Sequence, residues 1–132
     1  MAEVLLQYVI NERGQMPVGQ RVLADGTVQR PAEDNALPSE TERLDLDRAV
    51  NWQTVGHLEA GQVQSLKEAI TSSGFFNLEP RLLINYCKDD PGTAIWTVNV
   101  DGQSARVVVF DPRPRRSAQI DKLMEVLKTL VN

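Results

Sequence analysis

Apolar and polar residues alternate most regularly between Ala94 and Phe110, on both sides of an Asp101-Gly102 pair. Asp-Gly supplies the two positive-φ residues of a type I′ turn, whose twist matches that of the strands it joins. Folding the chain back at this turn aligns three apolar pairs: Val98 with Ala105, Trp96 with Val107, and Ala94 with Val109. The intervening pairs, Asn99 with Ser104 and Thr97 with Arg106, are polar, so we expect a β-hairpin with one buried and one solvated face.

The N-terminal part of the chain also predicts strands. Val4 to Ile10 is rich in β-branched and aromatic residues and predicts a first strand. A second Asp-Gly pair, Asp25-Gly26, lies between the strand-like segments Gln20–Ala24 and Thr27–Arg30. A two-residue turn there sets Leu23 opposite Val28, but it also sets Arg21 opposite Arg30, and like charges directly opposed are unfavourable. We expect Pro31 to Glu42, which is rich in proline and acidic residues, to be an exposed loop.

The middle of the chain changes from a strand pattern to a helix pattern. Ala49 to Leu58 alternates, with Trp52, Thr54 and Leu58 on one face and Gln53 and His57 on the other. A helical period then runs from about Ala60 to Ser73, and Gly74 is placed to end the helix as its C′ residue. Phe75, Phe76 and Leu78 form an apolar cluster that we expect to hold the end of this helix against the sheet. The mixed segment from Pro80 to Gly92 predicts no regular element.

A second helix is expected at the end of the chain, with Ser117 as its N-cap. Its apolar positions are spaced as on one face of a helix: Ile120, Leu123, Met124, Leu127, Leu130 and Val131. Strands and helices are segregated along the chain, which predicts an α+β fold: an antiparallel β-sheet built from hairpins, with two α-helices packed on one face. The core is expected to contain Trp52, Leu66, Ile70, Phe75, Trp96, Val98, Val107, Leu123, Leu127 and Leu130.

Composition limits the class of protein. A chain of 132 residues with 42% hydrophobic and 24% charged residues is expected to form a single globular domain over residues 1–132. No apolar run approaches the about 20 residues needed to cross a bilayer, and Met1-Ala2-Glu3 is unlike a signal peptide. A net charge of −4 argues against nucleic acid as a partner. With a single cysteine, Cys87, a cytoplasmic location is expected.

The residues that could support catalysis are few. His57 is the only histidine, and it does not stand at metal-ligand spacing with Cys87 or with a carboxylate. Asp89-Asp90-Pro91-Gly92 is a common turn composition, not a calcium loop, and no phosphate-binding or nucleophile motif occurs. We therefore expect a protein that is not an enzyme and has no cofactor and no metal site. A hydrolase with a carboxylate-based site is the remote alternative.

One polar cluster indicates a binding surface. Arg113, Arg115 and Arg116 lie in a segment stiffened by Pro112 and Pro114 at the start of the last helix. Guanidinium groups there could bind carboxylates or phosphates, and the prolines reduce the entropy lost on docking. The alternative interpretation is a solvated basic loop. A second candidate is the loop from Asn11 to Gln20, where Arg13 and Met16 are the residues expected to contact a partner.

The order of these elements resembles the emfourin-type family of small bacterial proteins. The resemblance covers most of the chain from about Val50 onward, including Phe75-Phe76-Asn77-Leu78, the Trp96 to Gly102 hairpin segment and the C-terminal amphipathic helix. It implies a cofactor-free module that binds another protein and inhibits a thermolysin-like metalloprotease. The acidic Pro31–Glu42 segment and the Pro-Arg segment after Asp111 depart from the family pattern, and no inhibitory residue is carried over. The alternative function is a structural or assembly subunit that acts by oligomerising.

Overall fold

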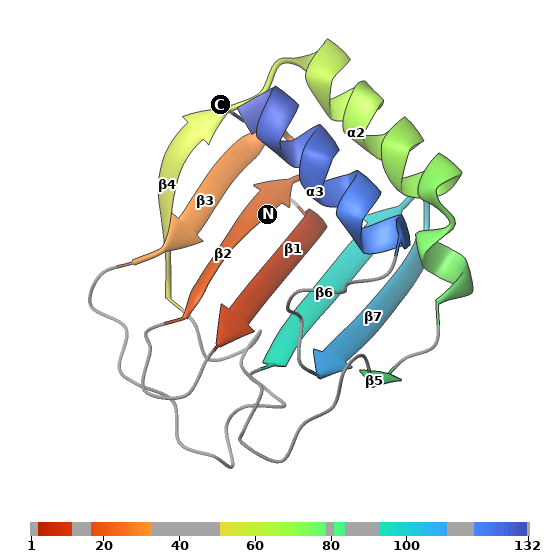
Figure 1. Ribbon diagram of the computed structural model, residues 1–132. Helices are drawn as coiled ribbons and strands as arrows, with labels where there is room; N and C mark the ends of the chain where they lie inside the picture. Colours follow the sequence, from red (N-terminus) through yellow and green to blue (C-terminus); the bar gives the residue numbers. More distant parts are fainter. Residues whose placement is uncertain are drawn as a thin grey trace.

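The computed structural model describes residues 3–11, 17–32, 51–78, 81–83, 93–110 and 118–131. These residues form a seven-stranded sheet in the order β4-β3-β2-β1-β6-β7-β5, and both α-helices lie on one face of it (Figure 1). The fold is therefore α+β, as the pattern predicted. The strands are β1 (Val4–Asn11), β2 (Val18–Leu23), β3 (Thr27–Pro31), β4 (Trp52–His57), β5 (Arg81–Leu83), β6 (Thr93–Val100) and β7 (Gln103–Phe110). The helices are α2 (Ala60–Ser73), the 3-10 helix η2 (Phe75–Asn77) and α3 (Ala118–Val131).

The β6–β7 hairpin has the register that its sequence predicts. Asp101 and Gly102 both have positive φ, at 50° and 85°, as a type I′ turn requires. Val98 lies opposite Ala105, Trp96 opposite Val107 and Ala94 opposite Val109. The turn and the apolar alternation specify the same pairing, which explains why local sequence was sufficient here.

The β2–β3 hairpin differs from its prediction by one residue. Arg21 lies opposite Gln29, and Val22 opposite Val28. The turn has three residues between the strands instead of two: the Gly26 N–H donates to the Leu23 carbonyl at 2.9 Å, and Gly26 has a φ of 98°. This is a turn closed by a glycine bulge. The shifted register replaces the unfavourable Arg21–Arg30 pair with a hydrogen bond of 2.7 Å from Arg21 Nε to Gln29 Oε1.

Edge strand β4 contains a bulge that changes which face its residues occupy. Gly56 lies opposite Val28 and Thr54 opposite Gln29, so Val55 is an extra residue in the pairing. One extra residue reverses the alternation beyond it. The prediction that His57 faces away from Trp52 was therefore wrong, since both lie on the face opposite the helices. Leu58, just after the strand, is buried in the core beneath the helices.

Helix α2 and its end follow the prediction closely. The Glu59 N–H donates to Gln62 Oε1 at 2.9 Å, and the Glu59 side chain completes a capping box at the start of the helix. Gly74 ends the helix in the left-handed conformation, with a φ of 82°. The buried Phe75 follows in η2, and its ring centroid lies 6.4 Å from that of Trp96. The aromatic residue after the helix thus connects α2 to the sheet.

The main core lies between the helices and the sheet. Trp96 is 1% exposed and stacks on Tyr8, with the ring centroids 4.7 Å apart. Leu130 is only partly buried at the edge of this core. The other predicted core residues apart from Trp52 are buried there: Leu66, Ile70, Phe75, Val98, Val107, Leu123 and Leu127.

A second, smaller apolar cluster lies on the opposite face of the sheet. Val9, Ile95 and Val108 are buried there, and the partly buried Trp52 packs against them. The prediction that Trp52 belongs to the core beneath the helices was therefore wrong. The β6–β7 hairpin is also less solvated on this face than expected, because Ile95 and Val108 lie directly opposite each other.

Strand β5 was not predicted. Its three residues pair in parallel with β7, with Leu82 opposite Val109. A strand this short has almost no alternation of its own, so its pairing depends on the strand beside it. The proposed cap Ser117 and the predicted loop at 33–42 lie outside the described residues. Among the described helices, none combines the length and the apolar character needed to cross a membrane.

Candidate functional site

The residues predicted to bind a partner lie outside the part of the chain that the structure describes. This holds for the arginine cluster, Arg113, Arg115 and Arg116, and for Arg13 and Met16 of the other loop. Cys87 and the Asp89-Asp90 pair also lie outside it. The candidate site consists of other residues, which lie on the helix-covered face of the sheet.

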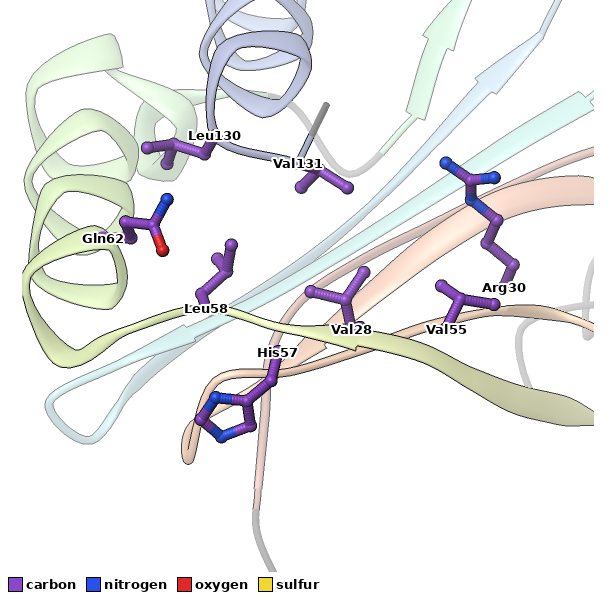
Figure 2. Close-up of a pocket in the computed structure, with 9 residues that line it drawn as sticks. Val28, Arg30, Val55, His57, Leu58, Gln62, Leu130 and Val131 are labelled. Carbon is purple, nitrogen blue, oxygen red and sulfur yellow. The ribbon is translucent and has the colours of Figure 1, made fainter.

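His57 lies on the exposed edge strand β4. Its imidazole points away from the space between β4 and α3, as Figure 2 shows. Across the described residues, no group of three or more histidine, cysteine, aspartate and glutamate side chains could hold a metal ion. The His57 side chain is exposed and lies beside the Asp25-Gly26 turn. It is close enough that a Cβ added to Gly26 would lie 3.2 Å from His57 Cε1.

A groove runs along α3 on the helix-covered face of the sheet. It consists of two hollows, and Arg30 lines both of them. We call this surface the α3 groove and define it by the described residues that line the two hollows. Its floor is formed by β1 to β4, and its wall by the last two turns of α3.

The first hollow lies beside the C-terminal end of α3 and encloses about 270 Å³. Val28, Val55 and Leu58 extend from the strands and the β4–α2 connection toward Leu130 and Val131 of α3 (Figure 2). Gln62 of α2 closes one end of the hollow. Most of its lining side chains are aliphatic, but Arg30, His57 and Gln62 also line it, and polar atoms make up most of the surface that the hollow exposes.

The second hollow lies farther back along α3 and encloses about 400 Å³. Its apolar lining includes Tyr8, Ile10 and Val18 from the strands and Met124 and Leu127 from the helix. Gln20, Arg30 and Lys128 supply its polar atoms. A concave, mostly apolar surface with a few polar groups is the usual composition of a binding site.

Two valines leave apolar surface uncovered in this groove. Val18, in the second hollow, is 58% exposed, and Val55, in the first, is 46% exposed. They are the large hydrophobic residues that stand out as exposed in the described part of the chain. Val55 faces the groove because it stands three residues after Trp52, whose side chain lies on the opposite face of the sheet. Each valine stands in a hollow beside further apolar lining residues, and exposed apolar surface of this kind indicates an interaction site.

The charged groups of the groove are both cations. Arg30 projects from β3 to the same side of the sheet as Val28 and Val55 (Figure 2), and Lys128 lies in the last turn of α3. Both side chains are exposed. None of the described lining residues carries a carboxylate. Neither cation has a hydrogen-bond or ion-pair partner within the described part of the chain.

On the opposite face of the sheet, several polar side chains interact with one another through hydrogen bonds and a cation–π contact. The Arg21 guanidinium lies 4.7 Å from the centre of the Trp52 ring, and Arg21 Nε donates to Gln29. Gln29 Nε2 in turn donates to Thr54 Oγ1 at 3.2 Å. Partial burial lowers the pKa of Arg21 below its usual value. This network connects β2, β3 and β4 and explains how the edge strand is held, so we assign it a structural role.

Comparison of the chain with protein-family models, with curated protein sequences and with solved structures finds no significant match. The groove and the sequence are therefore the features that bear on function. Sequence reasoning missed the groove because its residues come from six separate elements, β1 to β4, α2 and α3. The signal that could have indicated it is the wide apolar face of α3, since a face that ends in both Leu130 and Val131 has more apolar surface than the core covers.

Proposed function

We propose that this chain is a small protein-binding domain without catalytic activity, and that it acts by docking another protein in the α3 groove. The observation that supports the proposal is the pair of exposed valines, Val18 and Val55, each in one of two hollows, of which the second exposes a mostly apolar surface. A rigid sheet and helix form the groove, so little order has to be gained when a partner binds.

A protease is the partner class that we favour. The order of elements resembles the emfourin-type family, which implies inhibition of a thermolysin-like metalloprotease. A domain of this kind acts by occupying the surface of its target and needs no cofactor. In the proposed complex the α3 groove holds the partner, and the arginine cluster of Arg113, Arg115 and Arg116 provides a second, charged contact.

Comparative capture tests the docking surface. The wild-type protein and a Val18→Glu/Val55→Glu double variant are immobilised and exposed to the same extract, and bound proteins are quantified by mass spectrometry. A Gln103→Glu/Ser104→Glu variant adds the same charge at exposed positions near the β6–β7 turn and is the matched control. We expect at least one protein to bind the wild type and the control but not the groove variant. If every captured protein binds all three equally, the groove is not the docking surface.

Inhibition is tested separately with thermolysin and a fluorogenic peptide substrate. We expect the wild-type protein to lower the hydrolysis rate in proportion to its concentration and the groove variant to lower it less. An unchanged rate would rule out this protease class for the proposal.

Self-association through the same groove is the alternative function, because exposed valines could equally pack against a second copy. Light scattering after size-exclusion chromatography distinguishes the two functions. A regulatory binding domain is expected to be monomeric. A dimer or larger species that the Val18→Glu/Val55→Glu substitutions dissociate would instead support an assembly role.

A further inference from the structure

The chemistry of the α3 groove also indicates what kind of segment it binds, and this inference rests on the proposed docking function. Arg30 and Lys128 both line the second hollow and face no carboxylate among the described residues. The overall charge of the protein is −4, so two cations that have no carboxylate partner among the described residues run against the general charge of the molecule. Complementary charge is what fixes the register of a partner in an interface.

Apolar side chains lie on both sides of this positive charge, and the exposed surface is mostly apolar in the second hollow and mainly polar in the first. Arg30 lines both hollows, with Val28 and Val55 in the first and Ile10 and Val18 in the second. A ligand that satisfied only the cations would leave the exposed valines uncovered. A purely apolar ligand would bring an unpaired guanidinium into a desolvated site, which is costly. The complementary ligand therefore has a negative group between two apolar groups.

The helix dipole places the negative group within the groove. The last carbonyls of α3 carry partial negative charge, and Leu130 and Val131 at this end of the helix line the first hollow. An anion is thus disfavoured in the first hollow and favoured in the second, where Arg30 and Lys128 can both reach it. A carboxylate suits the planar donor fork of arginine particularly well.

We propose that the α3 groove binds a peptide segment of a partner protein in which one acidic side chain is flanked by apolar side chains. The acidic side chain lies between Arg30 and Lys128. One flanking apolar side chain enters the first hollow beside Val55, and the other enters the second hollow beside Val18. The volumes of about 270 and 400 Å³ can each hold a side chain of leucine or phenylalanine size.

A random heptapeptide library displayed on phage and selected on the immobilised protein tests this inference. We expect the enriched peptides to share a glutamate or aspartate with apolar residues on both sides. A synthetic fluorescent copy of an enriched peptide should bind the wild type, and its counterpart with glutamine in place of glutamate should bind about tenfold more weakly, as expected for a lost charge-assisted hydrogen bond.

Variants of the protein separate this inference from the proposed function. Arg30→Gln/Lys128→Gln should weaken binding of the acidic peptide about tenfold and remove most of its salt dependence. Lys67→Gln/Lys122→Gln removes the same charge elsewhere on the helices and should leave the affinity unchanged. If peptides need Val18 and Val55 but bind the Arg30→Gln/Lys128→Gln variant as tightly as the wild type, docking holds and the acidic specificity is wrong. If no selected peptide loses affinity for Val18→Glu/Val55→Glu, or if no peptide is enriched at all, both proposals are wrong.

Discussion

Individual side chains differ widely in how much they contribute to the free energy of unfolding, and Trp96 is expected to contribute more than most. It is 1% exposed, stacks on Tyr8 and lies against Phe75, so it contacts β1 and η2 as well as its own strand. Trp96→Ala is therefore expected to lower the free energy of unfolding by about 3–5 kcal/mol. Val18→Ala, at a site that is 58% exposed, should change it by less than about 0.5 kcal/mol. Urea denaturation measures both, and equal effects would contradict the proposed packing.

Asp25 is a residue whose charge acts through a local hydrogen bond. The Thr27 N–H donates to Asp25 Oδ1 at 2.9 Å, and this bond lowers the pKa of the carboxyl below its usual 3.8. Because the folded pKa is below the unfolded one, the charge stabilises the hairpin at higher pH, and that stabilisation is lost as the pH falls below about 4. Carboxyl chemical shifts measured by NMR during an acid titration report the pKa directly.

Asp25→Asn is the control for this prediction, because an amide oxygen can still accept from the Thr27 N–H but carries no charge. The stability difference between the wild type and Asp25→Asn should be constant near neutral pH and should shrink as the pH falls through the folded pKa of Asp25. A difference that stays constant down to pH values well below 3.8 would show that the charge has no role in this turn.

At the scale of elements, the two Asp-Gly turns look alike in sequence and differ in their surroundings. A Cβ on Gly26 would collide with the backbone carbonyl of Leu58, whereas a Cβ on Gly102 would meet open space. Both glycines have positive φ, so alanine is strained at either site. We expect Gly102→Ala to cost about 1–2 kcal/mol, which is the strain alone.

Gly26→Ala should cost more than Gly102→Ala by at least about 1 kcal/mol, because the chain after β4 must also move away from the turn. Thermal unfolding of the two single variants measures the difference. Equal melting temperatures would mean that Leu58 does not approach the turn closely, and the position of β4 against β3 would then need revision.

The elements that sequence predicted well are those in which two local signals agree. The β6–β7 register follows from both the turn residues and the alternation, and α2 ends where the apolar period meets Gly74. The errors occur where one extra residue interrupts a strand. A bulge at Val55 and a three-residue turn at Gly26 each shift the alternation, and neither leaves a distinctive residue pattern. The unfavourable Arg21–Arg30 pair did indicate that a two-residue turn at Asp25-Gly26 was the wrong prediction.

At the scale of the whole molecule, the groove exists because the sheet is wider than the helices that cover it. Seven strands lie side by side, and α2 and α3 occupy one face without closing over β3 and β4 (Figure 1). The sequence predicts strands and helices one at a time, but not the order in which the strands join. Arg30 and Val55 are distant in sequence and come together only because β3 and β4 are neighbours at the edge. The candidate site was therefore out of reach of sequence reasoning, although the α+β class was not.

The arginine cluster predicted from sequence gives an independent test of how the molecule contacts its partner. Pro112 and Pro114 restrict the segment that carries Arg113, Arg115 and Arg116, so little entropy is lost if these guanidinium groups dock on carboxylates or phosphates. Replacing all three arginines with alanine is expected to weaken binding to the captured partner and to reduce its salt dependence. The melting temperature should stay nearly unchanged, because solvated charges contribute little to stability.

The comparison with Arg30→Gln/Lys128→Gln shows whether the two surfaces contact the same partner. If both surfaces contact it without touching each other, the losses in binding free energy should add in the combined five-site variant. If the triple alanine variant binds the partner as tightly as the wild type does, the cluster is a solvated basic segment and the groove alone determines recognition. Titration calorimetry across a range of salt concentrations distinguishes these outcomes, because each ionic contact that is lost reduces the dependence of affinity on salt.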